Sequence, residues 1–277
     1  MSQFFFINQQ LTNNDSISLS HQQRGFLFGD GAFESCKIFN SKIINFEAHL
    51  QRLNKALDYL KIKADLSLIQ QQSLQLIAKN NCQNATLRIS ISRGIGSSGY
   101  LPTNQSQPLI IIETKNYSAD NSLKINLGIS YRNPAGFFFK SHSALNYVLS
   151  KIEAQENNFF DNILINDQKI VCETSSANIF WIKNKTIYTP SNECNIVQGC
   201  IRESILKLPD LEIVKTNSQL TEVLDADEVF ITNANHILCK VDSINYQNNS
   251  IEYPRFKNNL SDIIHQKLIT KFSINSI

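Results

Sequence analysis

Lys140 has the sequence setting in this 277-residue chain best suited to covalent chemistry. It ends the run Phe137-Phe138-Phe139-Lys140 and precedes a helical pattern over 144–154. Burial behind aromatic side chains disfavours the charged form of a lysine, and a neutral amine can form a Schiff base with a carbonyl group. From this segment alone, a solvated lysine before a helix is the more common case.

A single carboxylate, Glu173, stands in the stretch Cys172-Glu173-Thr174-Ser175-Ser176-Ala177-Asn178, which we expect to be a small-residue turn between two strands. An exposed glutamate in a polar loop is the ordinary interpretation. A carboxylate held there against a heteroaromatic nitrogen would instead keep that nitrogen protonated.

Two segments could bind a phosphate group. In Gln198-Gly199-Cys200-Ile201-Arg202 a loop is expected to become a helix, and the N–H groups at a helix start bind phosphate without a charged side chain. An ordinary capping turn fits the same residues. Arg52 lies beside the helical stripe of Leu50, Leu53 and Leu57, so its guanidinium either stays on the helix surface or reaches inward to an anion.

The segment Ser92–Tyr100 leaves a predicted strand through three glycines. It does not open a helix, so it is a poor match to a dinucleotide-binding loop. Either it is a plain hairpin loop, or its N–H groups and Arg93 meet a substrate carboxylate.

Composition excludes several classes of function. The net charge of +2 gives no electrostatic case for nucleic acid, and no apolar run is long enough to span a membrane. The N-terminus lacks the basic and apolar regions of a signal peptide, so a cytoplasmic location is expected. The six cysteines show no CxxC spacing, which favours reduced thiols over disulfides or a metal site. No Ser-His-Asp order supports a hydrolase.

The helices and strands expected from the sequence, which must position these residues, indicate an α+β fold with two domains. The domains are 1–115 and 123–277, joined by the polar stretch 115–122. Helical spacing predicts helices over 48–62, 66–79, 144–154 and 253–272, with a short one near Cys200. Alternation and short apolar runs predict strands. These are 4–8, 33–39, 85–92, 109–113, 123–131, 162–165, 169–171, 178–182, 186–188 and 228–233.

Five segments together resemble the fold-type IV pyridoxal-phosphate enzymes, which include branched-chain and D-amino-acid aminotransferases and 4-amino-4-deoxychorismate lyase. They occur in family order over nearly the whole chain. The segments are Phe28-Gly29-Asp30-Gly31-Ala32-Phe33-Glu34, His49-Leu50-Gln51-Arg52-Leu53, Lys140 before its helix, Glu173 through Phe180, and Gly199-Cys200-Ile201-Arg202.

The resemblance implies pyridoxal 5'-phosphate as cofactor. Lys140 would hold it covalently and move protons, Glu173 would pair with the pyridine nitrogen, and Arg52 would bind the phosphate. The resemblance also implies a homodimer that acts on a small-molecule substrate.

Main-chain groups are expected to complete the cofactor site. The N–H groups of Cys200 and Ile201 would bind the phosphate, where the family usually has Gly-Ile-Thr or Gly-Ile-Met instead of Gly-Cys-Ile. Asn233 and Ala234 are expected to contact the cofactor as well.

Among the family members, the lyase is resembled most. Ser92–Tyr100 looks like the lyase loop Arg-Gly-x-Gly-x-x-Gly-Tyr, and the segments 178–181 and 231–234 are also lyase-like. This implies conversion of 4-amino-4-deoxychorismate to 4-aminobenzoate and pyruvate, a step of folate biosynthesis. Four residues are expected to contact the substrate. They are Phe33, Arg93, Gly94 and Tyr147.

The segment after Lys140 departs from the family. Lyases usually show Lys-x-Leu-Asn and branched-chain enzymes Lys-x-Gly-Gly-Asn-Tyr, whereas this chain reads Lys140-Ser141-His142-Ser143-Ala144-Leu145-Asn146-Tyr147. Asn146 and Tyr147 are both candidates to meet the phenolic oxygen of the cofactor. An aminotransferase for branched-chain or D-amino acids is therefore the alternative, and a nucleotide-binding module without catalysis is a third interpretation.

Overall fold

The computed structural model describes residues 3–13, 16–103, 107–117, 124–254 and 259–273. The chain divides into two compact units. Unit 1 is Met1–Ala119 with Phe139–Ser143, and unit 2 is Asp120–Phe138 with Ala144–Ile277. The expected linker lies partly outside the described residues. Lys140 groups with unit 1, whereas the sequence placed it in the C-terminal domain.

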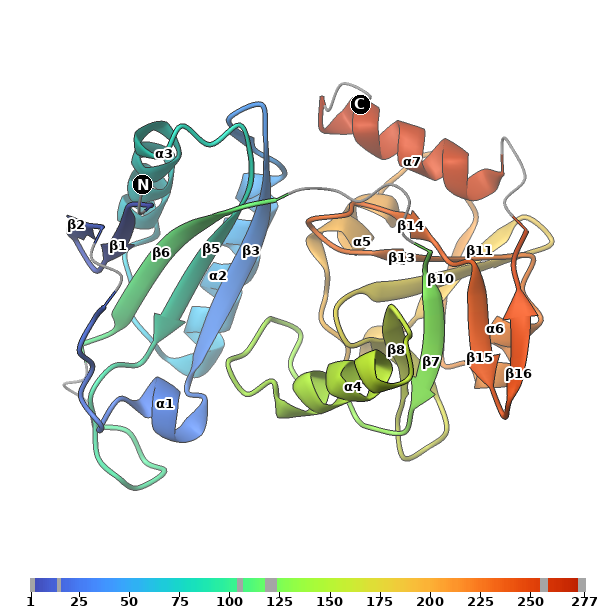
Figure 1. Ribbon diagram of the computed structural model, residues 1–277, viewed down its shortest axis with the longest axis horizontal. Coiled ribbons are helices and arrows are strands. Elements are labelled where there is room, and N and C mark those ends of the chain that lie inside the picture. The colour runs from blue at the N-terminus through green and yellow to red at the C-terminus, as the bar shows by residue number, and fades with distance from the viewer. Residues whose placement is uncertain (1–2, 14–15, 104–106, 118–123, 255–258, 274–277) are drawn as a thin grey trace. The chain divides into compact units, whose positions relative to one another are not determined.

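Unit 1 is built on a six-stranded sheet in the order β2-β1-β6-β5-β3-β4, all of whose pairs are antiparallel (Figure 1). Helices α2 and α3 contact one face of it. The strands are β1 Phe5–Ile7, β2 Gln10–Thr12, β3 Gly31–Phe39, β4 Lys42–Ile43, β5 Asn84–Ser92 and β6 Leu109–Asn116, and the helices are α1 Arg24–Phe28, α2 Phe46–Leu60 and α3 Leu66–Lys79.

Side-chain alternation on β3 and β5 divides unit 1 into a buried and an open sheet face. Leu87, Ile89 and Ile91 of β5 are fully buried, while Arg88 and Ser90 between them are only half-buried. Successive side chains of a strand point to opposite faces, so the apolar residues pack under the helices and the polar ones line the other face. The leucine stripe of α2 supplies the helical side of this core.

The segment Phe139–Ser143 adds to the sheet beside the start of β3. Ser141 forms a bridge with Ala32, the N–H of Phe33 donates to the carbonyl of Lys140 at 2.9 Å, and the N–H of His142 donates to Gly31 at 3.1 Å. Backbone pairing therefore fixes Lys140 next to β3.

Unit 2 contains two five-stranded sheets, in the orders β12-β11-β10-β13-β14 and β16-β15-β7-β8-β9 (Figure 1). One apolar core that includes Leu127, Ile163, Ile179 and Trp181 draws residues from both sheets. The strands are β7 Asn126–Ser130, β8 Asp161–Ile165, β9 Val171–Thr174, β10 Asn178–Lys183, β11 Thr186–Pro190, β12 Ile213–Thr216, β13 Glu228–Thr232, β14 Cys239–Lys240, β15 Ser243–Tyr246 and β16 Asn249–Glu252. The helices are α4 Leu145–Glu156, the 3-10 turn η1 Asn192–Cys194, α5 Cys200–Ile205, α6 Leu220–Leu224 and α7 Leu260–Lys271.

Two sequence expectations in unit 2 need correction. The expected strand 169–171 is instead β9, which begins at Val171 and contains Glu173, because every residue of Val171–Thr174 is buried and none belongs to a surface turn. The last helix begins at Leu260, not at residue 253; part of the expected range lies outside the described residues. None of the described helices has the length and apolar character that a bilayer crossing needs.

Candidate active site

In unit 1, Lys140 lies at an aromatic and cationic cluster that faces away from the helices. Its Nζ is 5.5 Å from the ring centroid of Phe33, and the guanidinium carbon of Arg88 is 4.0 Å from the same centroid. The ring of His142 stacks on Phe33 at 6.0 Å. Phe33 of β3 is therefore one aromatic neighbour of the lysine, while Phe139 is buried and packs on Tyr59.

His142 is a neutral member of this cluster. Burial, and then the charge of Arg88, lower its pKa to about 4, while the charge of Asp30 opposes the shift. From the sequence alone, this histidine is only a weak candidate for a functional residue. The signal for it was its position two residues from Lys140, on the same side of an extended segment.

We expect stability to fall as the pH drops from about 6.5 to about 4, because in that range the unfolded chain protonates His142 and the folded chain does not. The loss should amount to about 3 kcal/mol. Urea unfolding at several pH values in this range should show that the free energy of unfolding depends less steeply on pH in His142→Gln than in the wild type. His21→Gln, at an exposed histidine of the same unit, is the matched control; equal slopes in His142→Gln and wild type would contradict the expectation.

On the opposite face of β3, Arg52 of α2 is held in a buried ion pair. Its Nε and Nη2 donate to the two carboxylate oxygens of Glu34, each at 2.7 Å, and Nδ1 of His49 shares a hydrogen bond with Glu34 at 2.7 Å. Burial raises the pKa of Glu34, but Arg52 and His49 outweigh burial and hold it at about 2. The carboxylate of Glu34 is therefore charged, and its two hydrogen bonds fix the orientation of the Arg52 guanidinium through Nε and Nη2.

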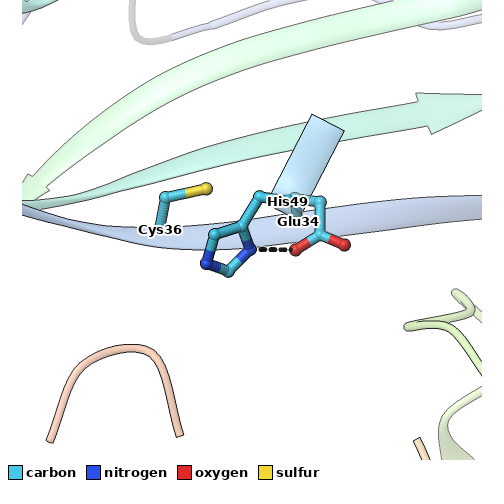
Figure 2. Close-up of side chains that lie close together, drawn as sticks. All are labelled: Glu34, Cys36 and His49. Atoms are coloured by element: carbon cyan, nitrogen blue, oxygen red, sulfur yellow. Dashed lines mark hydrogen bonds and ion pairs between the residues drawn. The ribbon is translucent and has the colours of Figure 1, made fainter. Parts of the chain in front are cut away.

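Cys36 lies beside Glu34 and His49, and the three could in principle hold a metal ion (Figure 2). Both oxygens of Glu34 already accept hydrogen bonds from Arg52, whose charge would repel a cation. The donor set therefore favours a hydrogen-bonded cluster that orients Arg52. The expected contact of Arg52 with a phosphate group remains a prediction.

Arg52→Ala should lower the free energy of unfolding by about 3 kcal/mol, because it leaves Glu34 charged and buried without its main partner. The double variant Glu34→Gln/Arg52→Gln should lose less than the sum of the two single changes in urea unfolding. Lys115→Ala is the control. It removes an exposed ion pair in which Nζ of Lys115 lies 3.9 Å from Oε1 of Glu113, and the free energy of unfolding should change little. Additive losses in the double variant would contradict this account.

Arg93, expected to meet a substrate carboxylate, is paired with groups of unit 1 in the structure, and its contact with substrate remains a prediction. Its Nε and Nη2 donate to Asp30 at 2.7 and 3.0 Å, and Nη2 also donates to the carbonyl of Leu60 at the end of α2, at 2.7 Å. Its charge and donors are thus directed into the interior of unit 1. Burial alone would raise the pKa of Asp30, but hydrogen bonds from Arg93 and Arg24 lower it.

The glycine-containing loop is held by Arg24, a residue the sequence analysis missed. The Arg24 guanidinium donates to the carbonyls of Ser97, Gly99 and Tyr100 at 2.7–3.0 Å. Gly94, also expected at the substrate, has φ +93°, and a Cβ there would lie 1.7 Å from the carbonyl of Gln107. Glycine is thus required by the backbone at this position.

In unit 2, Glu173 is a buried carboxylate with three kinds of donor. It accepts from the hydroxyl of Tyr147 at 2.7 Å, from Nδ2 of Asn178 at 3.1 Å and from the N–H of Val197 at 3.2 Å. Hydrogen bonds of this kind stabilise an ionised carboxylate. Burial and then the charge of Glu173 raise the pKa of Tyr147, so its hydroxyl stays protonated and donates.

Tyr147 is therefore a support for Glu173, and the structure gives its hydroxyl this partner and the N–H of Ala135. The side chain of Asn146 donates to the carbonyl of Asn133. Which side chain meets the phenolic oxygen of a cofactor remains a prediction.

The segment that bears Val197 leads directly into α5. Gly199 is the N-cap of α5 and provides no side-chain cap; a Cβ there would lie 2.0 Å from Oδ1 of Asn178. Asn178 connects this segment to Glu173, since its Nδ2 donates both to Glu173 and to the carbonyl of Val197, the latter at 2.8 Å. Cys200 and Ile201 form the buried first turn of α5.

Strand β13 ends near residues that the sequence assigned to the cofactor. Asn233 accepts from the N–H groups of Asn235 and His236 through Oδ1, so its side chain shapes the turn that follows, through Ala234. Within the described residues, Oγ1 of the buried Thr232 has no hydrogen-bond partner. A buried hydroxyl without a partner is costly and fits a bound polar group.

Comparison with known proteins establishes the family. Residues 31–244 match the family model described as amino-transferase class IV. The chain belongs to this family. It is 29% identical to an aminodeoxychorismate lyase of Vibrio harveyi, over 83% of this chain and 89% of that protein. It is 28% identical to an aminodeoxychorismate lyase of Bacillus subtilis (strain 168), over 95% and 96% of the two chains.

Among solved structures, the fold matches the branched-chain amino acid aminotransferase of Escherichia coli with a TM-score of 0.88 at 18% identity, covering 98% of this chain and 95% of that one. The protein thus has the fold-type IV architecture and, as a class IV enzyme, uses pyridoxal 5'-phosphate. The buried carboxylate of Glu173, the uncapped start of α5 and the unpartnered hydroxyl of Thr232 fit that cofactor. The individual residue roles remain proposals.

Proposed function

We propose that this enzyme is a lyase that converts 4-amino-4-deoxychorismate to 4-aminobenzoate and pyruvate. The observation that carries the proposal is the similarity, over 95% of the chain, to the Bacillus subtilis protein named aminodeoxychorismate lyase. The Vibrio harveyi relative with the same name supports it. Loss of the enolpyruvyl group as pyruvate makes the remaining ring aromatic, so the protein mainly has to place a proton and hold the carboxylates.

Bound pyridoxal phosphate acts as an electron sink for the carbon that loses a proton. We assign to Lys140 both the attachment of the cofactor and the transfer of that proton through its amine. We assign to Glu173 the pyridine nitrogen, because its three donors favour the charged carboxylate that stabilises a protonated ring. Arg52, oriented by Glu34, and the first N–H groups of α5 are proposed to hold the phosphate.

Arg88 is the cation that we assign to a substrate carboxylate in place of Arg93. It lies over the same Phe33 ring as Lys140 and is half-buried on the open face of the sheet, whereas Arg93 is already paired with Asp30. Burial lowers the pKa of Arg88, and Glu113 opposes this. A partly desolvated guanidinium binds carboxylate more strongly than one in water.

A coupled assay for pyruvate, with 4-amino-4-deoxychorismate as the only substrate, tests the proposal. We expect pyruvate and 4-aminobenzoate in equal amounts, with no added 2-oxo acid. A parallel panel of branched-chain and D-amino acids with 2-oxoglutarate should give far lower rates. Absence of pyruvate from the first assay would overturn the lyase assignment.

An aminotransferase is the second candidate, and one observation favours it. The segment Ser141–Tyr147 departs from the usual lyase sequence, and in the structure the hydroxyl of Tyr147 supports Glu173. Conversion of the bound cofactor to its amine form by an amino acid alone, detected by absorbance, would support transamination.

We further propose that the enzyme acts as a homodimer in the cytoplasm. None of the six cysteines, all of which lie in the described part of the chain, forms a disulfide, and this fits a reducing compartment. Light scattering coupled to gel filtration tests the oligomeric state directly, since a monomer at assay concentration would contradict it.

A further inference from the structure

Two thiols of unit 2 lie together directly beside the Glu173 site. Cys172 precedes Glu173 in β9, and Cys194 ends the 3-10 turn η1. They pack with Ile196 in a small buried cluster. The Cys194 thiol donates to Oδ1 of Asn217 at 3.2 Å, and the Cys172 thiol donates to the carbonyl of Ile170 at 3.5 Å. The two cysteines are 22 positions apart in the sequence, and no pattern indicated their proximity, because this spacing matches no cysteine motif.

The two thiols differ in acidity. The neighbouring Cys172 thiol, and then Ser191, lower the pKa of Cys194, and burial opposes them. The Cys194 thiol, burial and the charge of Glu173 raise the pKa of Cys172. Cys194 is therefore the more acidic of the two thiols and the one that reacts first, and Cys172 is the second, resolving thiol.

Access to Cys194 is limited to small reagents. Its exposed fraction is 3%, and Glu193 and Asn195 on either side of it are exposed, so the cysteine lies in a turn at the surface of unit 2 with its side chain turned inward. Hydrogen peroxide is small enough to reach such a site, and it reacts with thiolates.

We propose that Cys172 and Cys194 form a reversible disulfide, with hydrogen peroxide as the oxidant. The Cys194 thiolate attacks one peroxide oxygen, the O–O bond breaks, and hydroxide leaves to give a sulfenic acid. The Cys172 sulfur then attacks the Cys194 sulfur, the S–O bond breaks, and water leaves. Overall, two thiols and one peroxide give one disulfide and two waters.

The disulfide would act on the Glu173 site through the backbone. An S–S bond of about 2.0 Å draws the end of η1 toward β9. Val197, three residues after Cys194, donates its N–H to Glu173 at 3.2 Å, and its carbonyl accepts from Asn178. Displacing this segment weakens the support of Glu173, so the oxidised enzyme retains pyridoxal phosphate less well. This consequence rests on the proposed role of Glu173; the disulfide itself does not.

Peptide mapping of the purified holoenzyme after mild peroxide treatment tests the bond. Free thiols are alkylated and the protein is digested with trypsin, which places Cys172 in residues 170–183 and Cys194 in residues 186–202. We expect these two peptides to be joined, and dithiothreitol to separate them. Because residues 186–202 also contain Cys200, tandem mass spectrometry must locate the bond at Cys194. Alkylated Cys172 after treatment, or a bond to Cys200, would overturn the proposal.

Two variants complete the test. Cys194→Ser should abolish the joined peptides, and Cys239→Ser, at the one cysteine that is not buried, should leave them unchanged. Cofactor absorbance after desalting should fall several-fold on oxidation of the wild type and of Cys239→Ser. If the disulfide forms and the cofactor absorbance does not fall, the proposed effect of the disulfide on the Glu173 site is wrong. Pyruvate release by the reduced enzyme is scored separately, so failure of the lyase assignment is distinguishable from failure of the disulfide.

Discussion

Lys140→Ala is expected to reduce turnover by more than about 10⁴-fold, because the variant loses the amine that we assign both to cofactor attachment and to proton transfer. Proton transfer by a positioned group alone contributes about 10²–10⁴-fold. The backbone around residue 140 should be unaffected, since its carbonyl still accepts from the N–H of Phe33. The loss should appear in kcat for pyruvate release, with the far-ultraviolet circular dichroism unchanged.

Lys215→Ala is the control for this change. Lys215 is an exposed lysine on the edge strand β12, and its removal should leave kcat within experimental error. If Lys140→Ala kept its turnover within tenfold of the wild type, the activation free energy would have risen by no more than about 1.4 kcal/mol. The assignment of Lys140 would then be wrong.

Glu173→Gln is expected to lower kcat by about 10²–10³-fold, the usual cost of removing one preorganised electrostatic contact from an active site. Glutamine keeps the shape of the side chain but not the charge that a protonated pyridine nitrogen needs. It also places an amide N–H₂ group among donors, so the N–H of Val197 or the hydroxyl of Tyr147 loses its acceptor.

Tyr147→Phe provides a graded comparison at the same carboxylate. It removes one of the donors to Glu173 and keeps the charge, so we expect a loss of about tenfold, in line with one hydrogen bond to a charged group. The order of kcat should be wild type, Tyr147→Phe, then Glu173→Gln. A rate for Glu173→Gln equal to that of Tyr147→Phe would contradict the proposed pairing with the ring nitrogen.

The sequence predicts those parts of the fold whose side-chain pattern shows one buried face. The leucine stripe predicts α2, and the alternation of Leu87, Ile89 and Ile91 predicts β5. The pattern fails for Glu173, which was expected in a turn. Strand β9 is buried on both faces, so it shows no alternation, and its short polar residues resemble a turn.

Side-chain partners are predicted less well than elements. Arg93 and Asp30 are 63 positions apart, and no local pattern indicates which carboxylate an arginine of a glycine-containing loop will meet. The pair Glu34 and Arg52 did leave a signal, because each is a charged residue on the buried side of its element. Two such charges on adjacent elements must pair or be excluded from the core.

The central claim is that Lys140 holds the cofactor, and borohydride reduction of the holoenzyme followed by peptide mapping tests it most directly. Reduction fixes the cofactor on the amine that carries it, and a modified Lys140 resists trypsin. We predict a peptide spanning residues 133–151 that carries one phosphopyridoxyl group on Lys140. A phosphopyridoxyl group on a different lysine, or an unmodified peptide ending at Lys140, would contradict the account.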